Sequence, residues 1–135
     1  MPSLSSCIEQ VSAKFVYTPD PDPFPFDYWF VMKEKNGELK GDCDDFSVTV
    51  LWLLCNSSIL SFIWNVLILH RFKIHRVMAT NGYHVVGEVD GLFFDNWTKR
   101  ALPEGEFYAA TKHVHLQQYL SPVITLLLIS GLFKR

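Results

Sequence analysis

The spacing of apolar residues changes from a helical period to strand-like alternation about halfway along the chain. Residues 4–14 have the apolar spacing of a short helix, and residues 43–54 are so uniformly apolar that the helix they predict must be surrounded by protein. A further helix is predicted over residues 59–70. The three strands predicted after it cover residues 73–79, 83–89 and 92–96. Because Asp90-Gly91 predicts a two-residue hairpin turn, the pattern indicates an α+β domain with a buried helix packed against an antiparallel sheet.

Two long uncharged runs raise the question of a membrane segment. Residues 46–69 carry no charge and are long enough to cross a bilayer. Asn56-Ser57-Ser58 interrupts this run where a turn would fall, so we expect a buried helical hairpin, with a membrane segment as the alternative. Residues 119–133 are shorter than a usual span and predict a core or docking helix. Membrane contact is therefore an alternative and not the favoured interpretation.

Length and composition indicate one domain with a large core. Of the 135 residues, 49% are hydrophobic and 15% aromatic, which excludes a disordered chain. We divide the domain into an N-terminal helix with a proline- and aromatic-rich arm (1–40), a core (41–97) and a C-terminal segment (98–135). A net charge of −2, without a dense cluster of Lys and Arg, argues against nucleic acid as a partner.

Cysteine usage and the first residues bear on the compartment. Cys7, Cys43 and Cys55 are too few and too scattered for a disulfide framework, and their odd number fits a reducing compartment or at least one free thiol. The N-terminus lacks the basic and then apolar pattern of a secretory signal. The location stays open, and we expect a cytoplasmic or virion-associated protein.

A candidate nucleophile lies at the start of the apolar helix. The sequence there is Gly41-Asp42-Cys43-Asp44-Asp45-Phe46. Asp42 can act as N-cap, with Asp45 as the acid of a capping box. Cys43 then takes the first helical position, where backbone N–H groups and the helix dipole favour the nucleophilic thiolate. Because Asp42, Asp44 and Asp45 oppose that charge, a buried structural cysteine is the alternative.

The hairpin predicts a partner for a strand histidine. With a two-residue turn, His84 lies opposite Trp97, and Asp95 is its diagonal neighbour on the same face, within reach of a hydrogen bond. A slip of one residue would put the two side chains on opposite faces. If the helix that begins at Cys43 packs on this face, its tip brings the thiol to the other ring nitrogen. Nucleophile, base and orienting acid are the parts of a thiol hydrolase triad.

The other histidines are weaker candidates. His70 and His75 lie in a basic segment and are predicted to be solvated. His113 and His115 lie within residues 106–120, where the pattern is ambiguous between helix and strand.

Three ordered motifs resemble those of the bacterial transglutaminase-like cysteine peptidases, members of the papain-like superfamily. That family has Gly-Asp-Cys-Glu-Asp-Tyr/Phe at a helix start, a histidine on a following strand, and Leu-Asp-Asn on the next strand. The corresponding segments here are residues 41–46, 83–86 and 94–96, and residues 17–29 resemble the family's upstream Tyr–Asp and Asp-Tyr-Trp stretch. The resemblance covers about residues 15–97.

The resemblance implies a papain-like/transglutaminase-like core and a peptidase mechanism. It assigns Cys43, His84 and Asp95 as a triad that cleaves peptide bonds of a protein or peptide substrate through a thioester. Some relatives bind calcium through acids beside the cysteine, which correspond to Asp42 and Asp44. Here Asp44 replaces the usual Glu and shortens the reach.

The chain also departs from the family. The segment between cysteine and histidine is longer and more apolar than usual, and the expected export signal is missing. A compact member without a signal suggests a phage or mobile element. Two alternatives stay open: a hydrolase of peptidoglycan stem peptides that uses the same triad, and a non-catalytic structural or membrane-associated protein, such as a virion component, that keeps the fold.

Overall fold

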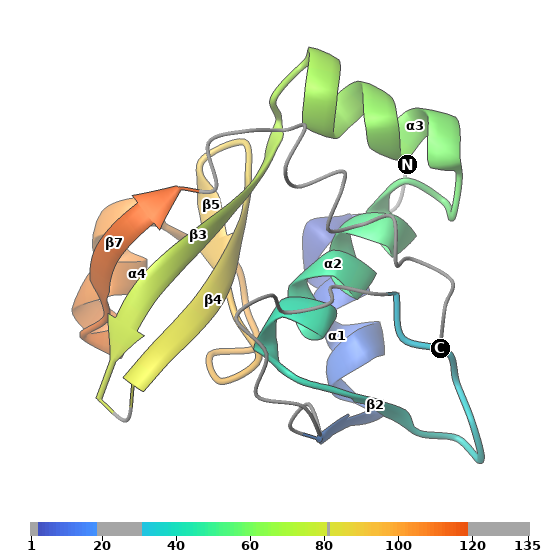
Figure 1. The fold of residues 1–135 in the computed structure, drawn as a ribbon, viewed down its shortest axis with the longest axis horizontal. Coiled ribbons are helices and arrows are strands. Elements are labelled where there is room, and N and C mark those ends of the chain that lie inside the picture. The colour runs from blue at the N-terminus through green and yellow to red at the C-terminus, as the bar shows by residue number, and fades with distance from the viewer. Residues whose placement is uncertain (1–2, 19–30, 81, 119–135) are drawn as a thin grey trace.

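A twisted five-stranded antiparallel sheet separates one helix from the others in this computed structural model, which describes residues 3–18, 31–80 and 82–118 (Figure 1). The helices are α1 (Leu4–Ser12), α2 (Cys43–Leu54), α3 (Ile59–Ile63), a π-helix (Trp64–Ile68) and α4 (Glu104–Thr111). The strands are β1 (Phe15–Tyr17), β2 (Leu39–Gly41), β3 (Phe72–Ala79), β4 (Gly82–Val89), β5 (Leu92–Phe94), β6 (Leu102–Pro103) and β7 (Val114–Gln118). The large sheet has the order β6-β5-β4-β3-β7, and β1 pairs with β2 in parallel.

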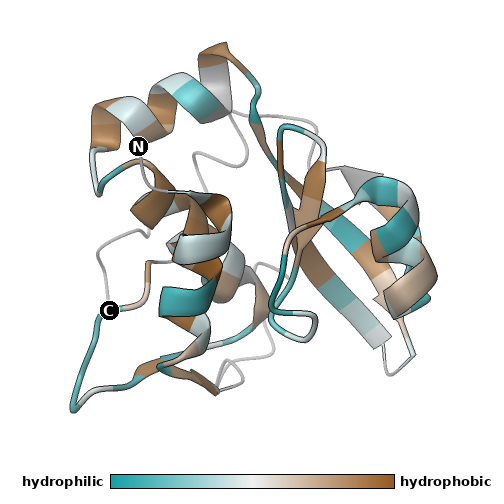
Figure 2. Ribbon diagram, turned by 180° about the vertical axis from the view of Figure 1, so that it is seen from behind, coloured by the Kyte–Doolittle hydropathy of each residue, from teal (hydrophilic) through white to brown (hydrophobic). Residues whose placement is uncertain are grey.

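The apolar helix α2 lies at the centre of the larger core, as its sequence predicts. It begins at Cys43 and ends at Leu54, the predicted bounds. Its side chains pack with α1 and with one face of the sheet, in a cluster that includes Phe46, Leu51 and Phe72. Figure 2 shows hydrophobic residues along α2 and along the strands that face it.

The two faces of β4 belong to different cores. Val85 and Val89 pack in the cluster of α1 and α2, whereas Val86 packs with Phe107 of α4. In Figure 1, α1 and α2 lie on one side of the sheet and α4 on the other. Because side chains alternate along a strand, β4 is buried on both faces.

The β4–β5 hairpin has the predicted register. Asp90 and Gly91 form its loop, so that Val89 pairs with Leu92 and Gly87 with Phe94. The ring of Phe94 lies directly over Gly87, and a Cβ atom there would collide with it. Glycine at this position therefore lets β4 and β5 approach closely.

Several predicted elements differ in detail. The helix predicted over 59–70 is divided into α3 and a π-helix that ends at Ile68. The strand predicted over 92–96 ends at Phe94, so Asp95 and Asn96 lie in the following turn. The loop predicted over 98–105 contains β6 and the start of α4, and the ambiguous residues 106–120 contain the rest of α4 and β7.

Other predictions concern residues outside the described ranges or the membrane alternative. The aromatic part of the arm (19–30) and the uncharged tail (119–133) lie outside the described residues. Within the residues that are described, no helix has the length and apolar character needed to span a bilayer. Figure 2 shows that α3 and the π-helix, at the outer edge, nevertheless carry hydrophobic residues, of which Leu60, Trp64 and Ile68 are exposed.

Candidate active site

The start of α2 is fixed by a complete capping box. The Asp45 backbone N–H donates to Asp42 Oδ1 at 3.3 Å, and the Asp42 backbone N–H donates to Asp45 Oδ2 at 3.1 Å. A Cβ atom on Gly41 would lie 2.8 Å from both Asp45 Cβ and Met32 Sδ. Glycine before the cap therefore lets the chain pass close to the helix. The predicted helix start, with Asp42 as N-cap and Asp45 as the acid of the capping box, is confirmed.

Cys43 occupies the first position of this helix and is half-buried. It packs at the margin of the core that contains Val85 and Phe94, which are the sequence neighbours of His84 and Asp95. The other thiols are buried, and burial raises the pKa of Cys7 and of Cys55. A raised pKa keeps a thiol protonated and inert, so Cys43 is the best placed of the three to react.

The predicted contact between His84 and Asp95 is present. The Nε2 atom of His84 lies 3.0 Å from Asp95 Oδ2, and both side chains are buried. The backbone N–H of Thr98 donates to the other oxygen, Oδ1, at 2.7 Å. Although Asp95 lies beyond the end of β5, the turn that follows holds its carboxylate on the His84 side.

The hydrogen bonds keep Asp95 ionised. Burial by itself would raise the pKa of this carboxyl group. The hydrogen bonds from His84, the Thr98 amide and His113 outweigh burial and lower the pKa from 3.8 to about 2. An ionised carboxylate has no proton to donate, so the hydrogen of the His84–Asp95 bond is carried by Nε2 of His84. Its Nδ1 is then the ring nitrogen that can exchange a proton.

This pKa shift predicts a contribution of Asp95 to acid stability. Because the carboxyl pKa is lower in the folded state than in the unfolded state, the unfolded protein binds more protons between pH 4 and pH 2. Asp95 therefore contributes about 2 kcal/mol to the free energy of unfolding above about pH 4. This contribution is lost as the pH falls to about 2. Denaturant unfolding measured from pH 6 to pH 2 should show this slope in the parent protein, and Asp95→Asn should lack that part of it. Equal slopes in both proteins would contradict the low pKa.

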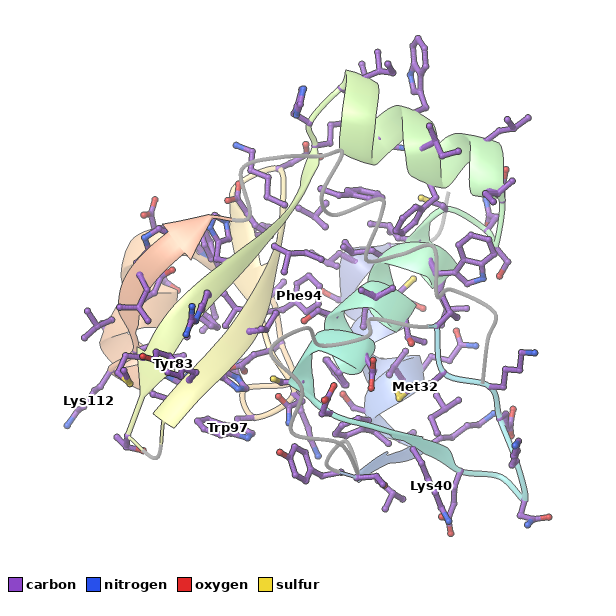
Figure 3. All side chains as sticks on the ribbon, viewed as in Figure 1. Met32, Lys40, Tyr83, Phe94, Trp97 and Lys112 are labelled. Atoms are coloured by element: carbon purple, nitrogen blue, oxygen red, sulfur yellow. The ribbon has the colours of Figure 1, made fainter. Side chains whose placement is uncertain are left out.

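Trp97 covers His84 from one side. The two rings stack with their centroids 4.2 Å apart and a 17° angle between planes. In Figure 3, Trp97 lies between the start of β4 and the N-terminal end of α2. The indole thus limits the orientations of the imidazole and shields it on that face.

From the sequence, the triad required the helix that begins at Cys43 to pack on the sheet face that carries His84. In the structure α2 packs on the opposite face. His84 shares its face of β4 with Val86, which belongs to the α4 core, whereas α2 packs against the opposite face through Val85 and Val89. The body of α2 therefore does not cover His84. A contact between Cys43 and His84 has to form at the rim of the sheet, where α2 begins, and not across a shared face.

Two histidines were missed or wrongly described from the sequence. His113, between α4 and β7, is buried, and its Nε2 lies 3.0 Å from the same oxygen of Asp95 that binds His84.

His75, predicted to be solvated, is 5% exposed. Its ring contacts Glu88 at 2.8 Å and His115 at 3.2 Å. Burial lowers the pKa of His75, and the bond to Glu88 opposes that shift. His70 is exposed.

Three side chains of types that can bind a metal ion gather at one place in the described residues. His84, Asp95 and His113 bring one ligand atom each within 4.8 Å of one another. Beside Cys43, the Asp42 and Asp45 carboxylates already accept the hydrogen bonds of the capping box. The side chain of Asp44 lies outside the described atoms, so the predicted calcium pair of Asp42 and Asp44 still depends on the sequence resemblance.

Comparison with known proteins gives similarity of fold. No family model matches the chain, and no curated protein is similar to it in sequence. Structures of LapG from Legionella pneumophila, including a calcium-bound and an EGTA-treated form, match with a TM-score of 0.56 at 15% identity over 87% of this chain. The chain spans 64% of the LapG chain in two of these structures and 62% in the third. At this identity the likeness concerns the fold alone: the protein has the α+β, transglutaminase-like fold of LapG.

Proposed function

We propose that this protein is a cysteine peptidase in which Cys43 is the nucleophile, His84 the proton acceptor and Asp95 the orienting carboxylate. The main support is the buried hydrogen bond of 3.0 Å between His84 Nε2 and Asp95 Oδ2, in a chain whose α2 begins with a half-buried cysteine. Support at the level of the fold comes from LapG, a bacterial transglutaminase-like cysteine protease.

The proposed reaction passes through a thioester. His84 Nδ1 accepts the thiol proton, and Cys43 Sγ attacks the carbonyl carbon of the scissile bond. The C–N bond then breaks, and the amine leaves with the proton from His84. Water, deprotonated by the same nitrogen, attacks the thioester and releases the carboxylic acid together with the thiol. We assign the backbone N–H of Cys43 as one donor to the oxyanion.

Asp95 supports this cycle through the tautomer of His84. Its carboxylate holds the proton on Nε2, which leaves Nδ1 to face the thiol, and it stabilises the imidazolium that forms during attack. Trp97, stacked on the same ring, limits the orientations that the imidazole can take.

The substrate is tested by three parallel assays on the purified protein. Casein tests general peptide hydrolysis, cell-wall sacculi test the stem-peptide alternative, and a glutamine donor with a labelled amine tests transglutamination. The proposal predicts thiol-dependent cleavage in the first assay. Each assay is run with the parent protein and with Cys43→Ser, since only loss of the signal in the variant assigns it to this site.

The calcium prediction needs a separate measurement. If acids beside Cys43 hold the ion, EGTA should lower the melting temperature or the activity, and added calcium should restore it. Asp44→Asn should reduce this response, whereas Glu106→Gln, an exposed acid on α4, should not. An unchanged melting temperature and activity in EGTA would remove calcium from the account.

A further inference from the structure

Asp95 has a second histidine partner that the proposed reaction does not use. His113 Nε2 lies 3.0 Å from Asp95 Oδ2, the same distance as His84 Nε2 from that oxygen. The two histidines come from different parts of the fold, because His84 lies on β4 and His113 between α4 and β7. The Thr98 amide donates to Oδ1 of the same carboxylate.

The direction of the hydrogen bond between His113 and Asp95 follows from the surroundings of the two side chains. Because Asp95 is ionised, His113 must donate its hydrogen from Nε2. Its Nδ1 is buried and has no hydrogen-bond partner in the described structure. The Nε2 atom of His113 is therefore the donor to Asp95.

The ring of His113 is also held in place by aromatic neighbours. Its centroid lies 5.2 Å from that of His84, 5.5 Å from that of Trp97 and 5.8 Å from that of Phe107. Lys112, immediately before it, adopts a left-handed conformation that ends α4. The end of α4 thus delivers this ring to the carboxylate.

We propose that His113 is a positioning residue, a second donor that fixes Oδ2 of Asp95 and thereby the orientation of His84. The inference deepens the proposed peptidase function and depends on it for its kinetic consequences. Without His113, Oδ2 has an unused lone pair in a buried site. A water molecule then binds it, or the carboxylate shifts. The hydrogen bond that aligns His84 then loses its fixed direction.

Two substitutions separate the donor from the ring. Gln places an amide N–H near the position of Nε2 and so keeps the donor, whereas Phe keeps the aromatic packing and removes the donor. For His113→Phe we expect kcat to fall on the order of tenfold, the scale of one hydrogen bond to a charged group, with KM unchanged. For His113→Gln we expect kcat within about threefold of the parent, because the amide N–H keeps most of that hydrogen bond. His70→Phe, at an exposed position, is the control.

The ring protons of His84 provide a readout independent of turnover. In protein labelled with ¹⁵N-histidine, the Nε2–H of His84 should give a downfield signal in the parent and in His113→Gln, and a broadened or shifted one in His113→Phe. If the parent hydrolyses no substrate, the peptidase function fails, yet this signal still decides the role of His113.

Three results would overturn the inference. One is parental kcat and an unchanged His84 signal in His113→Phe. Another is an equal loss in the Phe and Gln variants with a matching drop in melting temperature, because the role would then be structural. The third is a stoichiometric transition metal in purified protein that both variants lose, because His84, Asp95 and His113 would then be its ligands.

Discussion

Replacing Cys43 with serine should leave a folded protein without hydrolytic activity. The substitution changes one atom at a half-buried position, so the capping box and the start of α2 should persist. A serine hydroxyl has a far higher pKa than a thiol, so His84 removes its proton much less readily than that of Cys43. We expect the rate to fall on the order of 10⁴-fold or more, as for the loss of a nucleophile in comparable triads.

The matched control is Cys55→Ser. Cys55 is fully buried at the end of α2, and a hydroxyl there has to be desolvated, at a cost of about 1–3 kcal/mol in the free energy of unfolding. Its specific activity should equal that of the parent at a temperature where both are folded. Retained activity in Cys43→Ser, or a dead but folded Cys55→Ser, would refute the assignment of the nucleophile.

The second large effect is expected for Asp95→Asn. Every described neighbour of this carboxylate is a donor: two histidine Nε2 atoms face Oδ2, and the Thr98 N–H faces Oδ1. An amide would place its NH₂ group against one of these donors, and it would also remove the negative charge that stabilises the imidazolium. We expect kcat to fall on the order of 10³–10⁴-fold, with a lower melting temperature. Activity and a thermal melt are measured on the same preparation.

Asn96→Ala is the control for the hairpin register. Asn96 is buried, but its Oδ1 has no hydrogen-bond partner among the described residues. Its truncation should therefore affect stability and leave the rate within about tenfold, well below the loss expected for a triad member. If Asn96→Ala were inactive and Asp95→Asn active, the wrong residue would have been placed in the triad.

The elements that the sequence predicts correctly are those with strong local signals. The cap at Asp42 and Asp45 marks the start of α2, and the uniformly apolar run marks its buried character. The two-residue turn at Asp90 and Gly91 is sufficient to define the β4–β5 register. That register fixes the faces of His84 and Phe93, and the turn after Phe94, in which the Thr98 N–H binds Asp95, keeps the carboxylate on the His84 side.

The missed residues depend on contacts between distant segments. β7 pairs with β3 across about 40 residues, and nothing local in residues 106–120 signals that pairing. It is this topology that brings His115 to His75, and the adjoining end of α4 that brings His113 to Asp95. His75 lies among basic residues in sequence, but its own ring faces Glu88 and Phe93. Charge in the sequence neighbourhood therefore did not predict exposure.

The non-catalytic alternative can be separated from the peptidase by its surface. Leu60, Trp64 and Ile68 follow one another at four-residue intervals along α3 and the π-helix, and all three are exposed. A protein that uses only this surface would partition into detergent without any reactive thiol. A peptidase requires a reactive Cys43, whether or not this surface binds detergent.

The most direct test of the triad is the labelling of Cys43 by a thiol-directed probe at neutral pH, with the labelled residue identified by mass spectrometry. The proposal predicts rapid labelling at Cys43, with Cys7 and Cys55 labelled only after unfolding. It also predicts that His84→Ala, folded by its thermal melt, loses the rapid labelling. Equal labelling rates at Cys43 in the parent and in His84→Ala would contradict the pairing of thiol and imidazole on which the proposed function depends.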